Sequence, residues 1–336
     1  MNSYTNNSFT GQKSNTCGGK KKSTSEGLQG AMNTEEVDAW VKQGFTVDAD
    51  EFAALMATVK QTLQTELGVR KGSGMVRIDP ESVKSVVVIG DIHGDLKSLT
   101  HILKQPEVAE ADRIVFLGDY GDRGDESIAT YYLVFTLKAL QGGNDRITLM
   151  RGNHEGPPDL RFTPHELPFY FIQRFGEQGK ELYRALKDLW SYLPYATLIA
   201  GRYMLVHGGV PCHVSSLHDV AFARDSHPAS STFKELLWND PIEAYGCFES
   251  FRGAGNLFGR NVTAAFLRMA NVTTIIRSHE FCEGVETRHE GKILIVFSRK
   301  GAPYYNTKAA YLFLNGELLR EPQDAYTLAR RAARVW

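Results

Sequence analysis

The sequence predicts an α/β fold, because short apolar runs typical of buried strands alternate with segments of helical periodicity. Of its 336 residues, 42% are hydrophobic and 23% are charged, and the formal net charge is −1. These values are typical of a water-soluble globular protein. A near-neutral chain without a large basic patch is not expected to bind nucleic acid. Because its longest apolar runs fall well short of the roughly 20 residues that a spanning helix needs, no membrane association is expected either.

Residues 1–34 are predicted to be a disordered tail, because they are rich in Ser, Thr, Asn, Gly and Lys and poor in large apolar side chains. The lysines at 20–22 are read as solubilising charge, with a nuclear signal as the alternative. The first residues show no secretory pattern, so a cytoplasmic or nuclear location is expected. Free thiols in a reducing compartment are also predicted, because the four cysteines form no close pair. They are Cys17, Cys212, Cys247 and Cys282.

The stretch 34–69 is predicted to be helical. Asp48 is expected to cap a helix, with Glu51 three residues later as the partner of a capping box. Apolar side chains then recur on one face, which indicates packing against a core rather than chemistry. They are Phe52, Leu55, Met56, Val59 and Leu63.

Six short apolar runs follow, and each is predicted to be a buried strand. Helical spacing of apolar residues at 96–103 and 128–140 places helices after the first two runs, which predicts strand–helix–strand units. The six runs are 86–89, 114–117, 147–150, 203–206, 273–276 and 293–297.

Polar turns follow five of these runs directly. The turns are GDIHG (90–94), GDYGDRG (118–124), RGNHE (151–155), HGG (207–209) and RSHE (277–280). Singly, such signals are weak, because a Gly-Asp pair is a common turn and a lone histidine is a common core residue. In α/β sheets, however, binding sites form beyond the carboxyl ends of the strands, so these turns are expected to converge.

The residue types in these turns indicate a metal site that binds phosphate. Carboxylates, one asparagine and several histidines suit Mn, Fe or Zn better than the all-oxygen sites of Ca or Mg. Arginines beside such a site are typical of phosphate recognition, because the guanidinium fork matches the phosphate oxygens.

In this order the five motifs resemble the signature of the PPP-type Ser/Thr protein phosphatases, metallophosphoesterases related to the type 1, type 2A and calcineurin enzymes. The resemblance spans 46–318 and includes LLWNDP (236–241). It implies the metallophosphoesterase fold, a central β-sandwich flanked by helices with a dinuclear metal site at the carboxyl ends of the strands. The expected organisation is a catalytic domain over 35–320, followed by a short C-terminal extension over 321–336.

The resemblance also implies six metal ligands for two ions, with Mn²⁺ expected and Fe or Zn as alternatives. Asp119 would bridge the two ions, and a hydroxide between them would attack phosphorus directly. The implied ligands are Asp91, His93, Asp119, Asn153, His207 and His279.

Four further residues take catalytic roles by the same resemblance. His154 would protonate the leaving alkoxide, and Asp122 would orient its imidazole. Arg123 and Arg252 would bind the phosphate oxygens.

The sequence departs from the family pattern at two places near the expected site. Gly121 stands where the family usually has valine, which is expected to loosen the turn that carries Asp122 and Arg123. The family's Ser-Ala-Pro-Asn-Tyr-Cys segment is replaced over 298–306 by a stretch with inserted basic residues. Either Tyr304 or Tyr305 is then the tyrosine expected over the metals.

Several other residues are left out of the site. Cys212 and Cys282 follow ligand motifs, but packing is the better interpretation for each. The cluster Arg330, Arg331 and Arg334 is expected on a solvated helix face. Six histidines also lie outside the motifs, and the three from 213 to 227 are expected at the surface. The six are His101, His165, His213, His218, His227 and His289.

The predicted function is hydrolysis of phosphoserine or phosphothreonine in phosphoprotein substrates. The first alternative is a phosphatase for small compounds, including dinucleoside polyphosphates. A nuclease-like phosphodiesterase is disfavoured, because Phe281 stands where that branch has a second histidine. A non-catalytic scaffold is disfavoured because no expected ligand is missing. The C-terminus shows no type 2A-like tail, so no regulatory subunit is assigned.

Overall fold

A computed structural model of the protein describes residues 32–141 and 145–336. The tail expected over 1–34, with Lys20 to Lys22 and Cys17, lies outside the described residues except for its last three. Met32 is buried in the helical layer, and the side chain of Asn33 caps the first helix.

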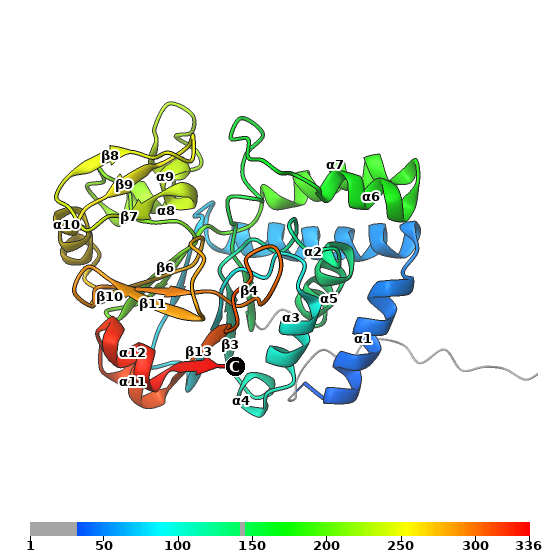
Figure 1. Cartoon of the computed structure of the whole chain (residues 1–336), viewed down its shortest axis with the longest axis horizontal. Helices are drawn as coiled ribbons and strands as arrows, with labels where there is room; N and C mark the ends of the chain where they lie inside the picture. The colour runs from blue at the N-terminus through cyan, green and yellow to red at the C-terminus, as the bar shows by residue number, and fades with distance from the viewer. Residues whose placement is uncertain (1–31, 142–144) are drawn as a thin grey trace, which may run out of the picture.

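Two mixed β-sheets form a central sandwich (Figure 1). The six-stranded sheet has the order β1 (Met75–Ile78), β5 (Ala196–Ile199), β6 (Tyr203–Val206), β10 (Thr274–Arg277), β12 (Ile293–Val296) and β11 (Val285–Arg288). The five-stranded sheet has the order β14 (Ala333–Val335), β13 (Ala310–Asn315), β2 (Ser85–Ile89), β3 (Arg113–Phe116) and β4 (Ile147–Leu149). All six predicted strands are confirmed, as β2, β3, β4, β6, β10 and β12, so the predicted α/β sandwich is confirmed as well.

The alternation of strand side chains divides the hydrophobic core into layers. Val86 and Val88 of β2 pack between the sheets with Leu205 of β6. Val87 and Ile89, which point the other way, pack against the helices. Because both faces of β2 are buried after Ser85, residues 86–89 are all apolar rather than alternating.

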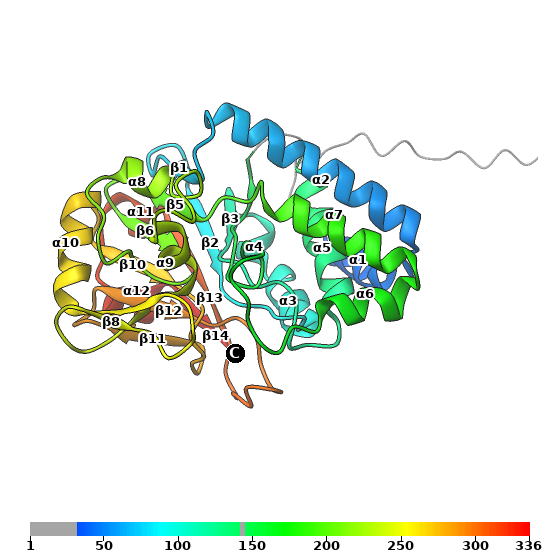
Figure 2. The same cartoon turned by 90° about the horizontal axis from the view of Figure 1, so that it is seen from above.

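Helices cover both outer faces of the sandwich (Figures 1 and 2). The larger layer lies on the five-stranded sheet and contains α1 (Thr34–Thr46), α2 (Ala49–Val69), α3 (Leu96–Leu103), α4 (Pro106–Ala109), α5 (Ser127–Leu140), α6 (Leu167–Phe175) and α7 (Gln178–Trp190). The six-stranded sheet is covered by α8 (Leu217–Ala221), α9 (Thr232–Trp238) and α10 (Arg260–Ala270), beside a small sheet of β7 (Asp240–Pro241), β9 (Asn256–Phe258) and β8 (Cys247–Glu249).

The helical stretch predicted over 34–69 is two helices, α1 and α2. Asp48 adopts an extended backbone, and its side chain accepts a hydrogen bond from the Glu51 N–H at 2.9 Å, as predicted for an N-cap. The reciprocal capping box forms instead at Asn33, whose N–H is bound by Glu36. The apolar face of α2 is buried as predicted, apart from the half-buried Leu55.

The C-terminal residues pack into the sandwich. After α11 (Gly316–Arg320), the helix α12 (Ala325–Arg331) contacts β10, β11 and β12, and β14 pairs antiparallel with β13. Arg330 and Arg331 lie exposed on α12, as predicted, and Arg334 is half-buried on β14. Within the described ranges, no helix combines the length and the apolar character needed to span a bilayer.

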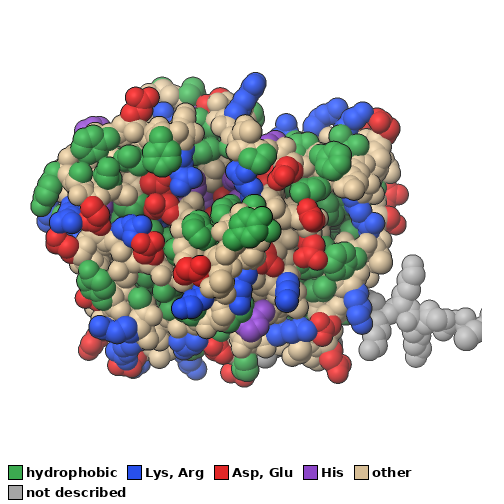
Figure 3. Space-filling model, in the orientation of Figure 1, with side chains coloured by type: hydrophobic (Ala, Val, Ile, Leu, Met, Phe, Trp, Pro, Cys, Tyr) green, Lys and Arg blue, Asp and Glu red, His purple; other side chains and the backbone are tan. Residues whose placement is uncertain are grey.

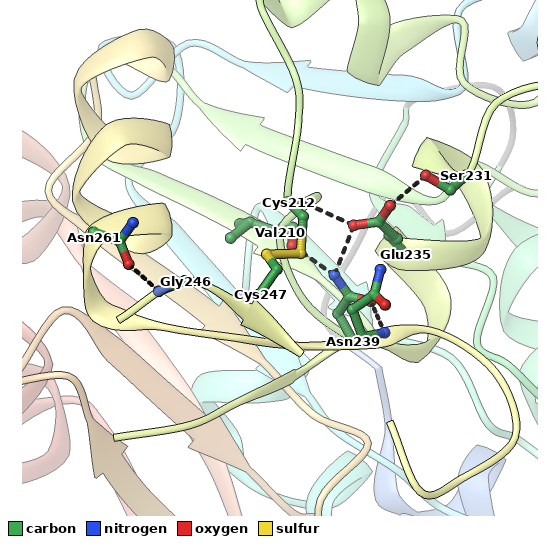
Figure 4. Close-up of a disulfide and its surroundings, with 9 residues drawn as sticks. Val210, Cys212, Ser231, Glu235, Asn239, Gly246, Cys247 and Asn261 are labelled. Atoms are coloured by element: carbon green, nitrogen blue, oxygen red, sulfur yellow. Dashed lines mark hydrogen bonds between the residues drawn. A yellow bond between two sulfur atoms is a disulfide. The ribbon is translucent and has the colours of Figure 1, made fainter. Parts of the chain in front are cut away.

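The prediction of free thiols is wrong for two of the cysteines. Cys212 and Cys247 form a disulfide, with their Cα atoms 6.1 Å apart (Figure 4). The bond ties the loop after β6 to β8, and a separation of 35 residues leaves no spacing signal in the sequence. The cytoplasmic or nuclear location stays a prediction. Cys282 is a buried free thiol, which agrees with its predicted packing role.

Candidate metal centre

The five polar turns converge at the carboxyl ends of β2, β3 and β4 from one sheet and β6 and β10 from the other. Asp119 lies at the centre, with Oδ2 3.3 Å from His93 Nε2 and 3.4 Å from His207 Nε2. Its carboxylate belongs to two buried groups whose ligand atoms lie within 4.8 Å of one another. The groups are His93, Asp119 and His154, and Asp119, His207 and His279.

The remaining expected ligands complete this cluster. Asp91 Oδ2 lies 3.6 Å from His93 Nε2. Asn153 Oδ1 lies 2.9 Å from His207 Nε2 and 3.1 Å from His279 Nδ1. All six residues predicted as metal ligands are therefore gathered in one buried site.

The hydrogen bonds of two histidines indicate which nitrogen faces the cluster. A carbonyl oxygen only accepts, so Nδ1 of His207 must donate to Leu117 O at 3.1 Å, and Nδ1 of His93 to Gly121 O at 2.9 Å. Nε2 of each ring therefore faces the oxygens of Asp119. When the rings are neutral, these nitrogen atoms offer lone pairs that a cation can bind together with the carboxylate oxygens. The donor set of nitrogen and oxygen atoms therefore fits a metal cation.

Burial and neighbouring charge perturb these groups in different directions. Burial lowers the pKa of His93 to about 4 and holds the pKa of His279 well below its usual value, which favours the neutral, ligating form. Burial also opposes protonation of His207, but the Asp119 carboxylate outweighs it and raises the pKa to about 9. Although burial favours its neutral acid, His207 and the other nearby histidines hold the pKa of Asp119 well below its ordinary range.

The backbone is strained where the ligands are presented. Five non-glycine residues of the site adopt positive φ angles, a region that costs a residue with a Cβ roughly 1–2 kcal/mol. The residues and their angles are His93 (44°), Asp119 (57°), Asp122 (62°), Arg123 (69°) and His279 (69°). Such strain persists only where surrounding bonds enforce it, as is common at functional sites.

Glu155 helps to hold the strained backbone around Asp119. The sequence prediction gave this residue no role, although it ends the RGNHE motif. Its Oε2 accepts the N–H groups of Asp119 at 2.8 Å and Gly152 at 3.1 Å. Its Oε1 accepts the Tyr120 N–H at 3.1 Å and the Tyr131 hydroxyl at 2.8 Å. Burial beside Asp119 raises the pKa of Glu155 to about 7, and these donors oppose the shift.

Gly121 makes room for an aromatic ring. A Cβ at this position would lie 2.8 Å from the ring of Tyr131 and 3.2 Å from Leu167. The space that a valine would fill is therefore occupied by Tyr131, whose hydroxyl binds Glu155. The loosening expected from the missing side chain is offset by this packing.

The pair predicted to supply a proton is formed. His154 Nδ1 lies 2.9 Å from Asp122 Oδ2, and both side chains are buried. Burial disfavours the charged imidazole, but the carboxylates of Asp119 and Asp122 outweigh it and raise the pKa of His154. Burial also works against the Asp122 carboxylate, yet its bonds to His154 and His165 lower the pKa of Asp122.

His165, which was left out of the predicted site, lies beside Asp122 in the structure. Its Nδ1 lies 3.1 Å from the same oxygen of Asp122 that His154 contacts. No motif marks His165, and its partner precedes it by 43 residues. Of the other histidines, His213 and His218 are exposed as predicted, and His227 is half-buried against Asp159.

The arginines divide into two kinds. Arg252 is about one-third exposed, and its Nε donates to Asp240, whose Oδ1 lies 3.9 Å from His279 Nε2. Arg123 is half-buried, with its backbone N–H bound by Glu166. The inserted Arg299 is buried and donates to the carbonyl oxygen of His93 at 3.0 Å, so it braces the turn rather than facing substrate.

Tyr304 is the tyrosine that faces the site. Its ring stacks on His93 with a centroid distance of 5.8 Å, whereas Tyr305 is 80% exposed.

The face of the molecule shown in Figure 3 carries basic and acidic side chains interspersed with one another, rather than one field of a single sign.

Comparison with known proteins identifies the family. Residues 84–283, which hold all five motifs, match the calcineurin-like phosphoesterases. The chain belongs to this family. The resemblance to PPP-type phosphatases that the motifs predicted is confirmed, and with it the metallophosphoesterase fold.

The relatives include protein phosphatases of yeasts. The chain is 30% identical over 279 residues to the serine/threonine-protein phosphatase 4 catalytic subunit of Kluyveromyces lactis, covering 82% of this chain and 84% of that protein. It is 34% identical over 248 residues, 71% of its length, to an Encephalitozoon cuniculi protein named as a probable serine/threonine-protein phosphatase, and spans about half (52%) of that relative.

A solved structure agrees. A protein serine/threonine phosphatase from Saccharomyces cerevisiae, with similarity to human phosphatase PP5, superposes with a TM-score of 0.72 at 26% identity. The match covers 84% of this chain and 89% of that one.

Proposed function

We propose that the protein is a metal-dependent phosphomonoesterase that removes phosphate from phosphoserine and phosphothreonine in proteins. The observation that carries this proposal is the Asp119 carboxylate, whose Oδ2 lies 3.3 Å from His93 Nε2 and 3.4 Å from His207 Nε2, near the hydrogen-bonded side chains of His154 and Asp122. The relatives named as serine/threonine-protein phosphatases support the substrate class. We assign the activity to residues 35–320.

Two cations would be held by the six gathered ligands. Asp91, His93 and Asp119 would hold the first, and Asp119 would share the second with Asn153, His207 and His279. When bound, such a pair polarises phosphoryl oxygens and lowers the pKa of water. The mixed nitrogen and oxygen donors suit Mn²⁺, Fe or Zn, and of these we propose Mn²⁺.

His154 would protonate the leaving alkoxide. Its Nδ1 is engaged by Asp122 at 2.9 Å, so Nε2 is the nitrogen left to face the substrate oxygen. The buried Asp122 carboxylate stabilises the imidazolium and fixes the plane of the ring. General acid catalysis of this kind contributes roughly 10²- to 10⁴-fold to the rate.

Arg123 and Arg252 would bind the non-bridging phosphate oxygens. The bond from Arg252 Nε to Asp240 fixes one side of the guanidinium and leaves its terminal N–H groups for the substrate. A planar fork held in this way suits two phosphate oxygens at once.

The test compares a phosphoserine peptide with a dinucleoside polyphosphate under identical Mn²⁺ concentrations. The proposal predicts turnover of the phosphopeptide, loss of that turnover on chelation and recovery when Mn²⁺ is restored. Preferential cleavage of the dinucleoside polyphosphate would contradict the substrate class. Full activity of His154→Ala on the phosphopeptide would contradict the assignment of the acid.

A further inference from the structure

The segment 162–167, which leads into α6 and includes its first residue, contacts the proposed acid machinery from one side. The Phe162 ring lies 3.9 Å from the His154 ring between centroids. The N–H groups of Glu166 and Leu167 both donate to Asp122 Oδ1 at 2.7 Å. Glu166 also accepts the N–H of Arg123 at 2.9 Å. One short segment therefore fixes the surroundings of three residues to which the proposed function gives roles.

His165 lies in this segment and links one carboxylate to one hydroxyl. Its Nδ1 is 3.1 Å from Asp122 Oδ2, and its Nε2 is 2.7 Å from the hydroxyl of Tyr183 on α7. An ionised carboxylate only accepts, so Nδ1 of His165 carries the proton of the first bond. The Tyr183 hydroxyl and His165 Nε2 are hydrogen-bond partners. A chain of hydrogen bonds thus runs from Tyr183 through His165 to Asp122.

Asp122 therefore accepts four hydrogen bonds in all. Oδ1 takes the two backbone N–H groups, and Oδ2 is shared between His154 and His165. Without His165, Asp122 Oδ2 would lose one of its two hydrogen-bond partners, and only the bonds at Oδ1 would then fix the carboxylate. The carboxylate could turn, and the His154 ring bound to it would turn with it.

We propose that His165 is a positioning residue for phosphate ester hydrolysis, which together with Tyr183 holds Asp122 in the orientation that aims His154 at the leaving oxygen. This inference rests on the proposed function of His154 as the acid. His165 lies outside the five motifs, and only the folding of segment 162–167 brings it to Asp122.

The leaving group separates this role from a general structural one. An alkoxide leaving from a phosphoserine peptide needs a proton, whereas p-nitrophenolate is stable enough to leave with little help. A misaligned His154 therefore slows the first reaction more than the second. Simple loss of folded enzyme lowers both rates by the same factor.

The experiment measures kcat and KM for both substrates in the full-length Mn²⁺ enzyme. His165→Leu is expected to lower kcat for the phosphopeptide by roughly 10- to 100-fold, with kcat for p-nitrophenyl phosphate falling by less than about threefold. His165→Asn, whose amide N–H replaces Nδ1–H, is expected to restore most of the loss. His213→Leu, at an exposed histidine far along the chain, is the matched control and is expected to leave both rates unchanged.

Two results would overturn the inference: an equal fall in both rates, or no fall for the phosphopeptide. Tyr183→Phe removes only the hydroxyl that bonds His165. We expect it to lower kcat for the phosphopeptide more than kcat for p-nitrophenyl phosphate, by a smaller factor than His165→Leu, so the test does not depend on the folding of His165→Leu. His154→Ala should give the same leaving-group pattern in larger measure. If the parent enzyme hydrolyses an alkyl phosphate but no phosphopeptide, the proposed substrate class fails. The role of His165 is then tested by comparing the fall in kcat for the alkyl phosphate with the fall in kcat for p-nitrophenyl phosphate.

Discussion

Substitution of Glu155 by glutamine tests how the strained Asp119 turn is held. The carboxylate has four donors aimed at it, three of them backbone N–H groups. Glutamine keeps the shape but replaces one oxygen by an NH₂ group, which cannot accept. Because the side chain is fully buried, water cannot take the place of the lost acceptor.

The magnitude follows from the two ways in which the amide can lie. With nitrogen in place of Oε2, the N–H groups of Asp119 and Gly152 both lose their acceptor. With nitrogen in place of Oε1, only the Tyr120 N–H does, because the Tyr131 hydroxyl can rotate and accept. The second arrangement is cheaper, and one orphaned buried donor costs about 1–3 kcal/mol. Glu155→Gln is therefore expected to lower the free energy of unfolding by at least about 1 kcal/mol.

Urea unfolding of the chelated protein measures this difference without a contribution from bound metal. Glu81→Gln is the matched control, because Glu81 is 69% exposed and lies 3.7 Å from Arg202, and exposed pairs contribute little. A Glu155→Gln protein as stable as the parent, within about 0.5 kcal/mol, would show that Glu155 does not hold the turn.

Three further predictions concern the disulfide, the glycine of the second motif and the phosphate site. Cys212→Ser should lower the free energy of unfolding by about 4 kcal/mol, as expected for a bridge across 35 residues, while Cys282→Ser under the same non-reducing urea titration should not show this entropic loss. An unchanged Cys212→Ser midpoint would mean that the bond does not form in solution. Gly121→Val should destabilise by about 1–3 kcal/mol, since its Cβ would lie 2.8 Å from the Tyr131 ring, and a thermal melt that does not fall would contradict that packing. Arg252→Ala should lower kcat/KM for a phosphopeptide by roughly 10- to 100-fold with an unchanged melting temperature, and unchanged kinetics would remove this residue from the phosphate site.

The strands and the gathering of the expected ligands were predictable because both signals are local. Each expected ligand follows a buried apolar run within a few residues, so finding the strand also places that residue at its carboxyl end. The division of the first helical stretch was partly visible too, since Asp48 was predicted as an N-cap in the middle of it.

The features that were missed depend on contacts between distant segments. His165 lies in a loop without a motif and meets Asp122 only because α6 begins beside the second turn. Cys212 and Cys247 pair because β8 folds back beside the loop after β6, and four cysteines without close spacing predict no pairing. Tyr304 could not be separated from Tyr305 by sequence, because neighbouring loop residues differ only in the direction that their side chains take.

We propose that Asp119 is shared by two cation positions, and the metal content of the purified chain decides whether it is. Titration of chelated protein with Mn²⁺, followed by electron paramagnetic resonance, should show two ions per chain with the signal of a magnetically coupled pair. Asp119→Asn should lose that coupling, while Glu81→Gln should keep it. One ion per chain, or two uncoupled ions whose signal does not change in Asp119→Asn, would contradict the account.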